Sequence, residues 1–237
     1  MDNLKIYICT HTDFDCPVHH PAYEIVDARN INGDRAENGL RGSFYSELMT
    51  YKYLADRKLP DYVGFCGYRK YFGFMDNVPD VGSIIREHGC IATERERFGM
   101  TVYEQYALHH ARQDMDLLRE VTSWDLIGMD LDHMLLGYEM HTCNMFIMRR
   151  EDFLELMRWV WDALDGYLAK AGNIEQRIKS HPEWYMRRHG RGGTYEHQYR
   201  IGGFLGERIV SAFIMKRFPH AQTYPMIVTG KPKQQNV

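Results

Sequence analysis

Several common signatures are absent from this sequence, and each absence narrows the class of protein. It contains neither a G-x-G-x-x-G fingerprint nor a Walker pattern, so the sequence offers no dinucleotide-binding signature and no P-loop. Its five cysteines form no C-x-x-C pair, which is typical of reduced, mostly buried thiols in a cytosolic protein. No window approaches the roughly 18 consecutive apolar residues of a membrane-spanning helix, and no apolar signal-peptide region follows Met1. We therefore expect a cytoplasmic protein without a membrane span, whose contact with the inner face of the membrane would be peripheral.

The sequence also lacks a strong charge of either sign. With 29 basic and 32 acidic residues, its formal net charge is −3, which argues against a nucleic-acid partner. Hydrophobic residues (44%) and charged residues (26%) occur in the proportions of a soluble globular protein. Aromatic residues, at 13%, suit a protein that stacks rings on sugars or bases, although the same residues can fill a core. The length of 237 residues suits a single domain over residues 1–230, followed by a polar tail at 231–237 that we expect to be disordered.

Strand and helix patterns alternate along the chain. They predict strands at 5–10, 23–27, 62–66, 90–92, 144–148 and 225–228, helices at 43–59, 101–122 and 152–168, and a last helix that begins after Gly203 and runs through Lys216. The helix at 43–59 separates two strands, and such a βαβ order implies that these strands run parallel. We therefore predict an α/β fold with a mixed, mostly parallel sheet flanked by helices.

The stretch 61–74 carries the most distinctive chemistry. Its apolar strand ends at Gly67, and Tyr68, Arg69 and Lys70 follow directly. In open α/β sheets, ligands bind at the carboxyl ends of strands, so the two cations are placed to meet an anion such as a pyrophosphate. The alternative is that both cations lie in solvent along an amphipathic edge.

Two D-x-D patterns raise the question of a divalent metal. Asp114 and Asp116 lie in the predicted helix 101–122, and Asp130 and Asp132 follow in a less regular stretch. Many glycosyltransferases use this spacing to hold a divalent cation under a nucleotide diphosphate. Residues two apart in a helix point in different directions, which argues against a shared ion at Asp114 and Asp116. Metal binding therefore stays open, with Mn²⁺ or Mg²⁺ as the candidate ion.

Two further sets of side chains are placed to act on a substrate. His110 and Asp114 are four residues apart on the predicted helix and would share one of its faces. Gly202 and Gly203 precede the last predicted helix, where backbone can approach a ligand closely, and Glu207 stands in its first turn. Glu207 is then either a surface residue that suits the helix dipole or a carboxylate general base at the rim of a pocket.

The order of these motifs resembles a family of bacterial glycosyltransferases associated with capsular and exopolysaccharide biosynthesis. That family opens with a strand ending in T-H, here Thr10 and His11, and has a strand running into H-Y-R-R-Y-F, here residues 67–72. A helix with H-x-x-x-D-L-D follows, here residues 110–116, and then an N-M-F-I-M strand at 144–148 and a G-F-L-x-E-R stretch at 203–208. The resemblance covers roughly residues 4 to 228.

The resemblance implies a GT-A-like nucleotide-diphospho-sugar transferase fold, with the donor bound at the strand ends. It implies that Tyr68, Arg69 and Lys70 bind the donor diphosphate, that Thr10 and His11 contact the nucleoside, that Asn144 orients the sugar or the acceptor, and that Glu207 or Asp114 deprotonates the acceptor hydroxyl. His110, Asp116 and Arg208 belong to the same motifs and are further candidates. The sequence departs from the family pattern at Gly67, where the family has His, and at Lys70, where a point charge replaces the bidentate fork of Arg.

The expected reaction is sugar transfer from a nucleotide-sugar donor to a hydroxyl group of a glycan or lipid-linked glycan. One alternative is a glycosyltransferase that acts on protein or on modified nucleic acid. A second is a catalytically inactive protein that binds nucleotide-sugars or carbohydrate, which Gly67 makes conceivable. The donor sugar, the linkage, and retention or inversion of configuration stay open.

Overall fold

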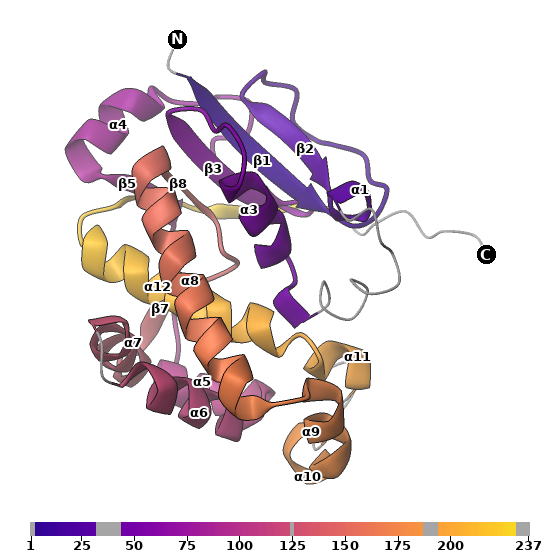
Figure 1. Cartoon of the computed structure of the whole chain (residues 1–237). Helices are drawn as coiled ribbons and strands as arrows, with labels where there is room; N and C mark the ends of the chain where they lie inside the picture. Colours follow the sequence, from indigo (N-terminus) through magenta and orange to yellow (C-terminus); the bar gives the residue numbers. More distant parts are fainter. Residues whose placement is uncertain (1–2, 32–43, 124–125, 187–193, 231–237) are drawn as a thin grey trace.

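The computed structural model describes residues 3–31, 44–123, 126–186 and 194–230, and Figure 1 shows their arrangement. The predicted tail at 231–237 and Ser43, the expected start of a helix, lie outside these ranges. The described strands are β1 (Leu4–Thr10), β2 (Tyr23–Asp27), β3 (Tyr62–Gly67), β4 (Lys70–Phe72), β5 (Cys90–Thr93), β6 (Arg95–Arg97), β7 (Glu139–His141), β8 (Phe146–Arg149), β9 (Gln222–Tyr224) and β10 (Met226–Val228). The described helices are α1 (Ala28–Ile31), α3 (Leu48–Ala55), α4 (Val81–His88), α5 (Val102–His109), α6 (Arg112–Thr122), α7 (Leu126–Leu136), α8 (Arg150–Ala171), α9 (Ile174–Ser180), α10 (Pro182–Tyr185), α11 (Tyr195–Gln198) and α12 (Ile201–Arg217).

One eight-stranded sheet forms the centre of the described chain. β1 lies between β2 and β3 and runs parallel to both, in the two longest ladders of the sheet. β8 pairs antiparallel with β3 and with β5, and β9 pairs parallel with β5. β4 folds back antiparallel to β3, while β6 and β7 form a separate two-stranded sheet. The predicted α/β fold with a mixed, mostly parallel sheet flanked by helices is confirmed. The strands on either side of the helix predicted at 43–59, β2 and β3, run in the same direction as predicted, since both run parallel to β1.

β9 and β10 occupy unusual positions in this sheet. Only Pro225 separates them in the sequence, yet β9 pairs with β5 and β10 pairs with β4, at opposite ends of the strand path. The sheet therefore curls so that β4 and β5 each pair with part of one continuous segment, residues 222–228.

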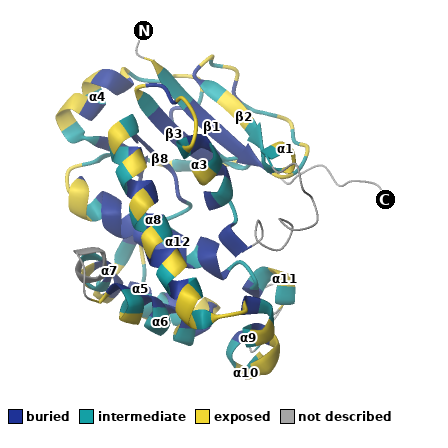
Figure 2. Cartoon of the chain, viewed as in Figure 1, coloured by how far each residue is buried: buried dark blue, intermediate teal, exposed yellow. Residues whose placement is uncertain are grey.

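The central strands send alternate residues into two cores, one on each face of the sheet. In β1, Ile6 and Ile8 belong to the smaller core, whereas Tyr7 and Cys9 belong to the larger one, as the two-residue period of a strand requires. α4 covers the smaller core, and α3, α8 and α12 supply much of the larger one. Figure 2 shows buried residues along β1, β3 and most of α12, whereas α8 alternates buried with exposed turns. α12 is thus enclosed, and α8 is an amphipathic outer helix.

The structure corrects three of the predicted helical features. The helix expected at 101–122 is two helices, because His110 adopts an extended conformation with φ −136° and ψ 170° between α5 and α6. His110 and Asp114 therefore do not share one helix face. Asp130 and Asp132, expected in a less regular stretch, lie within α7.

Candidate functional site

The carboxyl ends of β1 and β3 and the start of β8 meet at one edge of the sheet. β1 and β3 run parallel with Cys9 opposite Gly67, and the Tyr68 N–H donates to the Cys9 carbonyl oxygen at 3.1 Å. β8 runs antiparallel to β3 with Phe146 opposite Phe65, so the residues just before β8 reach the same edge. Most of the site residues predicted from the sequence lie here. We call the strand-edge cluster the set His11, Tyr68, Arg69, Lys70, Cys143, Asn144 and Glu207.

His11, Tyr68 and Arg69 lie against one another in this cluster. The rings of His11 and Tyr68 meet edge to face with their centroids 5.4 Å apart, and the Arg69 guanidinium lies 4.9 Å from the centre of the Tyr68 ring. Partial desolvation and the nearby guanidinium groups of Arg200 and Arg69 lower the pKa of His11. His11 is therefore a neutral ring at neutral pH, beside cations that carry the positive charge.

Thr10, the other residue predicted to contact a nucleoside, has a local role in the ligand-free chain. Its side chain is buried, and its hydroxyl donates to the Thr12 carbonyl oxygen at 2.6 Å while accepting the Thr12 N–H at 3.1 Å. These two bonds shape the turn that presents His11 at the end of β1.

Tyr68 and Arg69 form a tight turn between β3 and β4. Gly67 and Lys70 are the residues that pair across this turn, so the cationic stretch is a hairpin and not a single strand with a loose end. At Gly67, no heavy atom lies within 4 Å of where a Cβ would stand. This position therefore has room for the Cβ atom of another residue, and packing at that atom does not require glycine.

Two successive residues before β8, Cys143 and Asn144, have left-handed backbone conformations with φ of 73° and 52°. Such conformations cost free energy for residues with side chains, and they gather at functional sites. Asn144 is 3% exposed, its Nδ2 donates to Glu47 Oε1 at 2.9 Å, and its carbonyl oxygen accepts the Tyr51 hydroxyl at 2.8 Å. Its Oδ1 atom is buried and has no hydrogen-bond partner among the described residues. This oxygen is an acceptor that a ligand hydroxyl or N–H could satisfy.

Lys70 connects the hairpin to this strained pair. Its Nζ donates to Cys143 Sγ at 2.8 Å. Burial opposes the charged ammonium, but Cys143 and the carboxylates of Glu207 and Glu47 together raise the pKa of Lys70. Burial raises the pKa of the Cys143 thiol, although Lys70 opposes this shift. The pair therefore presents a charged ammonium beside a neutral thiol.

Glu207 reaches the strand-edge cluster from α12. Its Oε1 accepts the Cys143 N–H at 2.6 Å, and its Oε2 pairs with Arg208 NH1 at 2.7 Å. Because α12 begins at Ile201, Glu207 lies in the second turn, and the expected first-turn position is wrong. The helix-dipole argument therefore gives no reason for a carboxylate at this position.

Asp114 lies apart from the cluster, in a buried network of helical residues. Its Oδ1 accepts hydrogen bonds from the hydroxyls of Tyr167 at 2.8 Å and Tyr185 at 2.9 Å and from Arg177 Nε at 3.1 Å. Burial raises the pKa of Asp114, and these three donors only partly offset that effect. Its recorded partners come from α8, α9 and α10, and none belongs to the strand-edge cluster.

The three remaining candidates also lie outside the cluster. Asp116 accepts a hydrogen bond from the Tyr103 hydroxyl at 2.5 Å and pairs with Arg112. His110 is buried with its ring stacked on Phe204 at 3.8 Å. Arg208 is buried beside Glu207, and its NH2 donates to Gln105 at 2.6 Å. Arg208 thus touches the cluster through Glu207, whereas His110 and Asp116 belong to the α5 and α6 region.

The two D-x-D patterns do not fit a shared metal ion. Asp114 and Asp116 face different partners, as the helical spacing predicts, and Asp130 and Asp132 are paired with Lys216 and Arg119. Within residues 3–31, 44–123, 126–186 and 194–230, no three His, Cys, Asp or Glu side chains are grouped to hold a metal. The four D-x-D carboxylates are thus engaged by other residues.

Three residues that sequence reasoning missed complete the surroundings of the cluster. Glu47 bonds Asn144, Arg200 Nε donates to Ser46 Oγ at 2.8 Å, and Arg200 NH2 lies 4.0 Å from Glu47 Oε2. Ser46 has a left-handed φ of 52°. Their only sequence signal is that Arg200 stands two residues before the Gly202-Gly203 pair, where a close backbone approach was expected.

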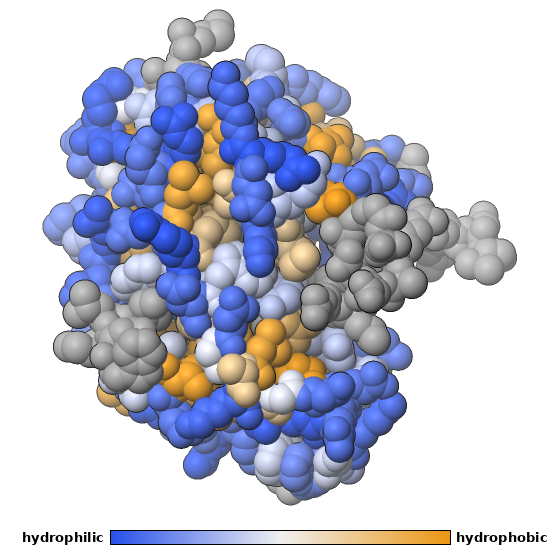
Figure 3. Space-filling model, in the orientation of Figure 1, coloured by the Kyte–Doolittle hydropathy of each residue, from blue (hydrophilic) through white to orange (hydrophobic). Residues whose placement is uncertain are grey.

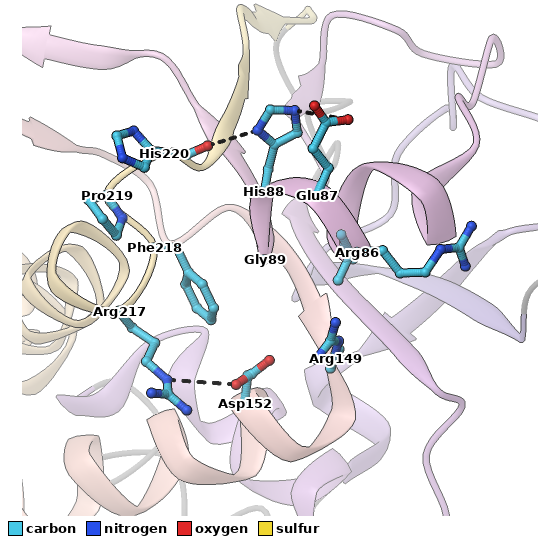
Figure 4. A pocket seen from close by; sticks show the side chains of 11 residues that line it. Arg86, Glu87, His88, Gly89, Arg149, Asp152, Arg217, Phe218, Pro219 and His220 are labelled. Atoms are coloured by element: carbon cyan, nitrogen blue, oxygen red, sulfur yellow. Dashed lines mark hydrogen bonds and ion pairs between the residues drawn. The ribbon is translucent and has the colours of Figure 1, made fainter.

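A pocket lies at the opposite edge of the sheet, between α4, the start of α8 and the end of α12. Figure 4 shows the Asp152 carboxylate 3.9 Å from Arg217 Nε, and His88 Nδ1 3.1 Å from the His220 carbonyl oxygen. Arg149 lines this pocket at the carboxyl end of β8, whereas Cys143 and Asn144 lie before the other end of the same strand. The predicted site residues do not line it.

The visible face of the molecule is mainly hydrophilic. Figure 3 shows polar and charged residues over most of it, with hydrophobic side chains between them in separate patches. Within the part of the chain that the structure describes, no helix is long and apolar enough to cross a membrane.

Comparisons with known proteins agree with this fold. A family model described as "Domain of unknown function (DUF4422)" matches residues 5–218. The solved apo structure of WbbM, described as a bifunctional glycosyltransferase, superposes with a TM-score of 0.72 at 14% sequence identity over 98% of this chain. The match takes in 46% of the WbbM chain, so this chain spans just under half of that protein. No curated protein matches the sequence significantly.

Proposed function

We propose that this chain, which belongs to the DUF4422 family, is a glycosyltransferase that moves a sugar from a nucleotide-sugar donor to a hydroxyl group of a glycan or lipid-linked glycan. The observation that carries the proposal is the strand-edge cluster. Cations, an unpartnered buried amide oxygen and a carboxylate meet there, at the sheet edge where α/β folds bind ligands. The fold likeness to a bifunctional glycosyltransferase supports the same class.

The donor diphosphate is bound by Tyr68, Arg69 and Lys70 in this proposal. Both cations stabilise the negative charge that develops on the nucleoside diphosphate as the bond from its oxygen to the anomeric carbon breaks. Each charge-assisted contact contributes roughly 1.5 to 3 kcal/mol. Thr10 and His11, at the end of β1, contact the nucleoside.

Glu207 is the proposed general base. As the acceptor oxygen bonds to the anomeric carbon, its proton passes to a Glu207 carboxylate oxygen. Each carboxylate oxygen has about two lone pairs, so the bonds to Cys143 and Arg208 leave acceptor capacity on both. Asn144 Oδ1 orients the sugar or the acceptor through a hydroxyl. Asp114 stays a second candidate for the base, with the network around it as the reason to rank it below Glu207.

The biological setting we propose is surface polysaccharide biosynthesis, with capsule or exopolysaccharide as the product. The transfer would be of a hexosyl or pentosyl group, in the cytoplasm, with peripheral contact at the inner face of the membrane where a lipid-linked acceptor lies. The motif order supports this setting.

A screen of nucleotide-sugars tests the proposal. A bound donor stabilises the native state by mass action, so at least one member of a panel of UDP-, GDP-, dTDP- and CMP-linked sugars should raise the melting temperature. The same donor should then be hydrolysed slowly without acceptor, which separates an enzyme from an inactive binder. Arg69→Ala should lower turnover by orders of magnitude without changing the melting temperature of the free protein.

Arg86→Ala is the matched control, because Arg86 lines the pocket at the opposite edge of the sheet. This variant should keep the turnover of the unmodified chain. A panel in which no donor stabilises the chain or reacts would contradict the proposed function. Near-normal turnover in Arg69→Ala would remove Arg69 from the site.

A further inference from the structure

Arg200 brings a third cation to the strand-edge cluster from the C-terminal part of the chain. It directly precedes α12, and its side chain is 37% exposed. Its Nε atom donates to Ser46 Oγ, and its NH2 atom lies 4.0 Å from Glu47 Oε2. Glu47 in turn accepts from Asn144 Nδ2. A continuous set of contacts therefore joins Arg200 to the strained residues before β8.

These contacts hold the Arg200 side chain without neutralising it. Ser46 is uncharged, and a separation of 4.0 Å is the outer limit of an ion pair. The Glu47 carboxylate is shared with Asn144 and also acts on Lys70. Arg200 therefore keeps positive charge for another partner.

The position of the Arg200 side chain depends on Ser46, which packs closely against Gly203. Ser46, which receives its hydrogen bond, has a left-handed conformation, and Gly203 packs against it so closely that a Cβ would stand 2.6 Å from Ser46 Oγ. The left-handed conformation of Ser46 costs free energy, and such a conformation persists where the surrounding structure holds it in place. The close contact with Gly203 is part of that surrounding structure. The Arg200 guanidinium also lies 5.6 Å from the centre of the Phe204 ring.

Arg200 and Arg69 act on the same imidazole. Both lower the pKa of His11, and Glu47 and Asp27 are the carboxylates that act on it in the opposite direction. Arg69 comes from the β3–β4 turn and Arg200 from the start of α12, so cations approach His11 from two separate elements.

We propose that Arg200 binds the donor diphosphate together with Arg69 and Lys70, so that the anion is held between the β3–β4 turn and the start of α12. This inference rests on the proposed function for the identity of the anion. It adds a cation that the motifs do not contain, from an element that none of the donor-binding candidates belongs to. Glu47 and Glu207 are carboxylates that act on Lys70, and a diphosphate held this way adds its negative charge among the three cations.

Calorimetric titration of the full chain with nucleoside diphosphates (UDP, GDP, dTDP) and with inorganic pyrophosphate tests this inference. Arg200→Ala should weaken the affinity for the ligand that binds the unmodified chain by roughly 10-fold to 100-fold, because one charge-assisted contact is lost. The affinity for the corresponding nucleoside, which has no phosphate, should stay unchanged. Arg200→Lys keeps the charge without the fork and should show a smaller loss.

Arg217→Ala is the matched control, since Arg217 is the last residue of the same helix. It should bind every probe as the unmodified chain does. Melting temperatures show whether each variant is folded. If Arg200→Ala folds poorly, the affinities of Arg200→Lys and the unmodified chain are compared instead. NMR titration of His11 adds a readout without ligand: Arg200→Ala removes a neighbouring positive charge and should raise the His11 pKa, whereas Arg217→Ala should leave it in place.

The outcomes separate the inference from the function on which it rests. Nucleotide binding that is equally tight in Arg200→Ala overturns the role of Arg200 and leaves the function standing. Pyrophosphate binding that depends on Arg200, in a chain that binds no nucleotide, supports the anion site and contradicts the nucleotide-sugar function. Failure to bind any of the four probes overturns both.

Discussion

Glu207 and Asp114 are two carboxylates that the sequence puts forward for one task, and their surroundings separate them. Glu207 contacts the strained Cys143 backbone, whereas Asp114 is buried among two tyrosines and an arginine. A general base must reach the proton that it removes. Glu207 lies beside the proposed donor site, and we therefore propose it, and not Asp114, for this task.

Glu207→Gln should therefore lower kcat by roughly 10²-fold to 10⁴-fold, because an amide cannot take the acceptor proton. Its donor affinity should change little, since the amide oxygen can still accept the Cys143 N–H, whereas its melting temperature should fall because the buried Arg208 loses its carboxylate partner. Asp114→Asn should instead show a loss of about 1 to 3 kcal/mol in the free energy of unfolding with kcat nearly unchanged. Steady-state kinetics and urea unfolding measure both effects. A loss of turnover in a stable Asp114→Asn variant would show that Asp114 takes part in the reaction.

His141 gives the protein a pH-dependent stability. Burial lowers the pKa of His141 from 6.5 to about 4, although its Nδ1–H donates to the Thr93 carbonyl oxygen at 2.7 Å. Between these two pH values the unfolded chain binds a proton that the folded chain rejects, so stability should fall as the pH drops from about 6.5 to about 4. The full loss from this group is about 3 kcal/mol.

Urea unfolding at pH 7 and at pH 4.5 measures this loss. His141→Asn should shrink the difference in unfolding free energy between the two pH values. Replacing His109, which is exposed, should leave the difference in place. An equal pH difference in His141→Asn and the unmodified chain would exclude this origin.

At the residue scale, the sequence could predict the members of the site that stand at strand ends. Arg69 and Lys70 directly follow an apolar strand, and parallel strands bring their carboxyl ends together. Glu47 and Arg200 could not be found in this way. Glu47 meets Asn144 across 97 residues of sequence and Arg200 meets Ser46 across 154, and local patterns contain no record of such pairs.

Glycines determine how closely α12 approaches the segment before α3. A Cβ at Gly202 would stand 2.4 Å from the Phe44 ring, one at Gly203 would stand 2.6 Å from Ser46 Oγ, and one at Gly206 would stand 2.3 Å from Leu48 Cδ1. The close approach expected at the glycine pair is thus between two parts of the protein itself. It fixes Ser46, and through Ser46 it fixes Arg200.

Gly203→Ala should destabilise the protein by roughly 1 kcal/mol, because overpacking of about 1 to 3 kcal/mol outweighs a gain of about 1 kcal/mol in helix propensity. It should also weaken nucleotide binding, since Ser46 must move. Gly166→Ala in α8 is the matched control: its Cβ would lie 3.6 Å from Val121, an ordinary contact. This variant should gain stability, and thermal unfolding of both variants checks the opposite signs.

At the element scale, periodicity predicted α3, α5, α6, α8 and α12, but not the break between α5 and α6. The apolar positions of α5 and α6 read as one helix because only His110 and Ala111 leave helical geometry between them. The strand β4 was not predicted either, because local periodicity does not reveal it. It has three residues, and its partner β10 lies more than 150 residues away, so its strand character comes from pairing.

For the molecule as a whole, we propose that the cations of the site offset the diphosphate charge, as a metal does in many nucleotide-sugar enzymes. The D-x-D carboxylates bond other residues, whereas Arg69, Lys70 and Arg200 surround the strand ends. We therefore expect turnover to be unchanged in excess EDTA. Complete loss of turnover in EDTA, restored by Mn²⁺ or Mg²⁺, would contradict this expectation.

The fold class was the most predictable property of the whole molecule. The order of strands and helices suffices for an α/β sheet in which β2 and β3 run in the same direction, because a helix between two strands of one sheet is typical of a parallel crossover. The antiparallel insertion of β8 between β3 and β5 could not be predicted, since it depends on which strands meet after a long helical excursion.

The curled sheet has a consequence for how the protein folds during its synthesis. The segment that joins both ends of the strand path, Gln222–Val228, leaves the ribosome after every other described strand. Until then, β4 and β5 each present an unpaired edge, and unpaired edges invite pairing with other chains. The nascent chain is thus most exposed to edge-to-edge pairing before this segment has emerged. A chaperone that shields strand edges would matter most at that stage.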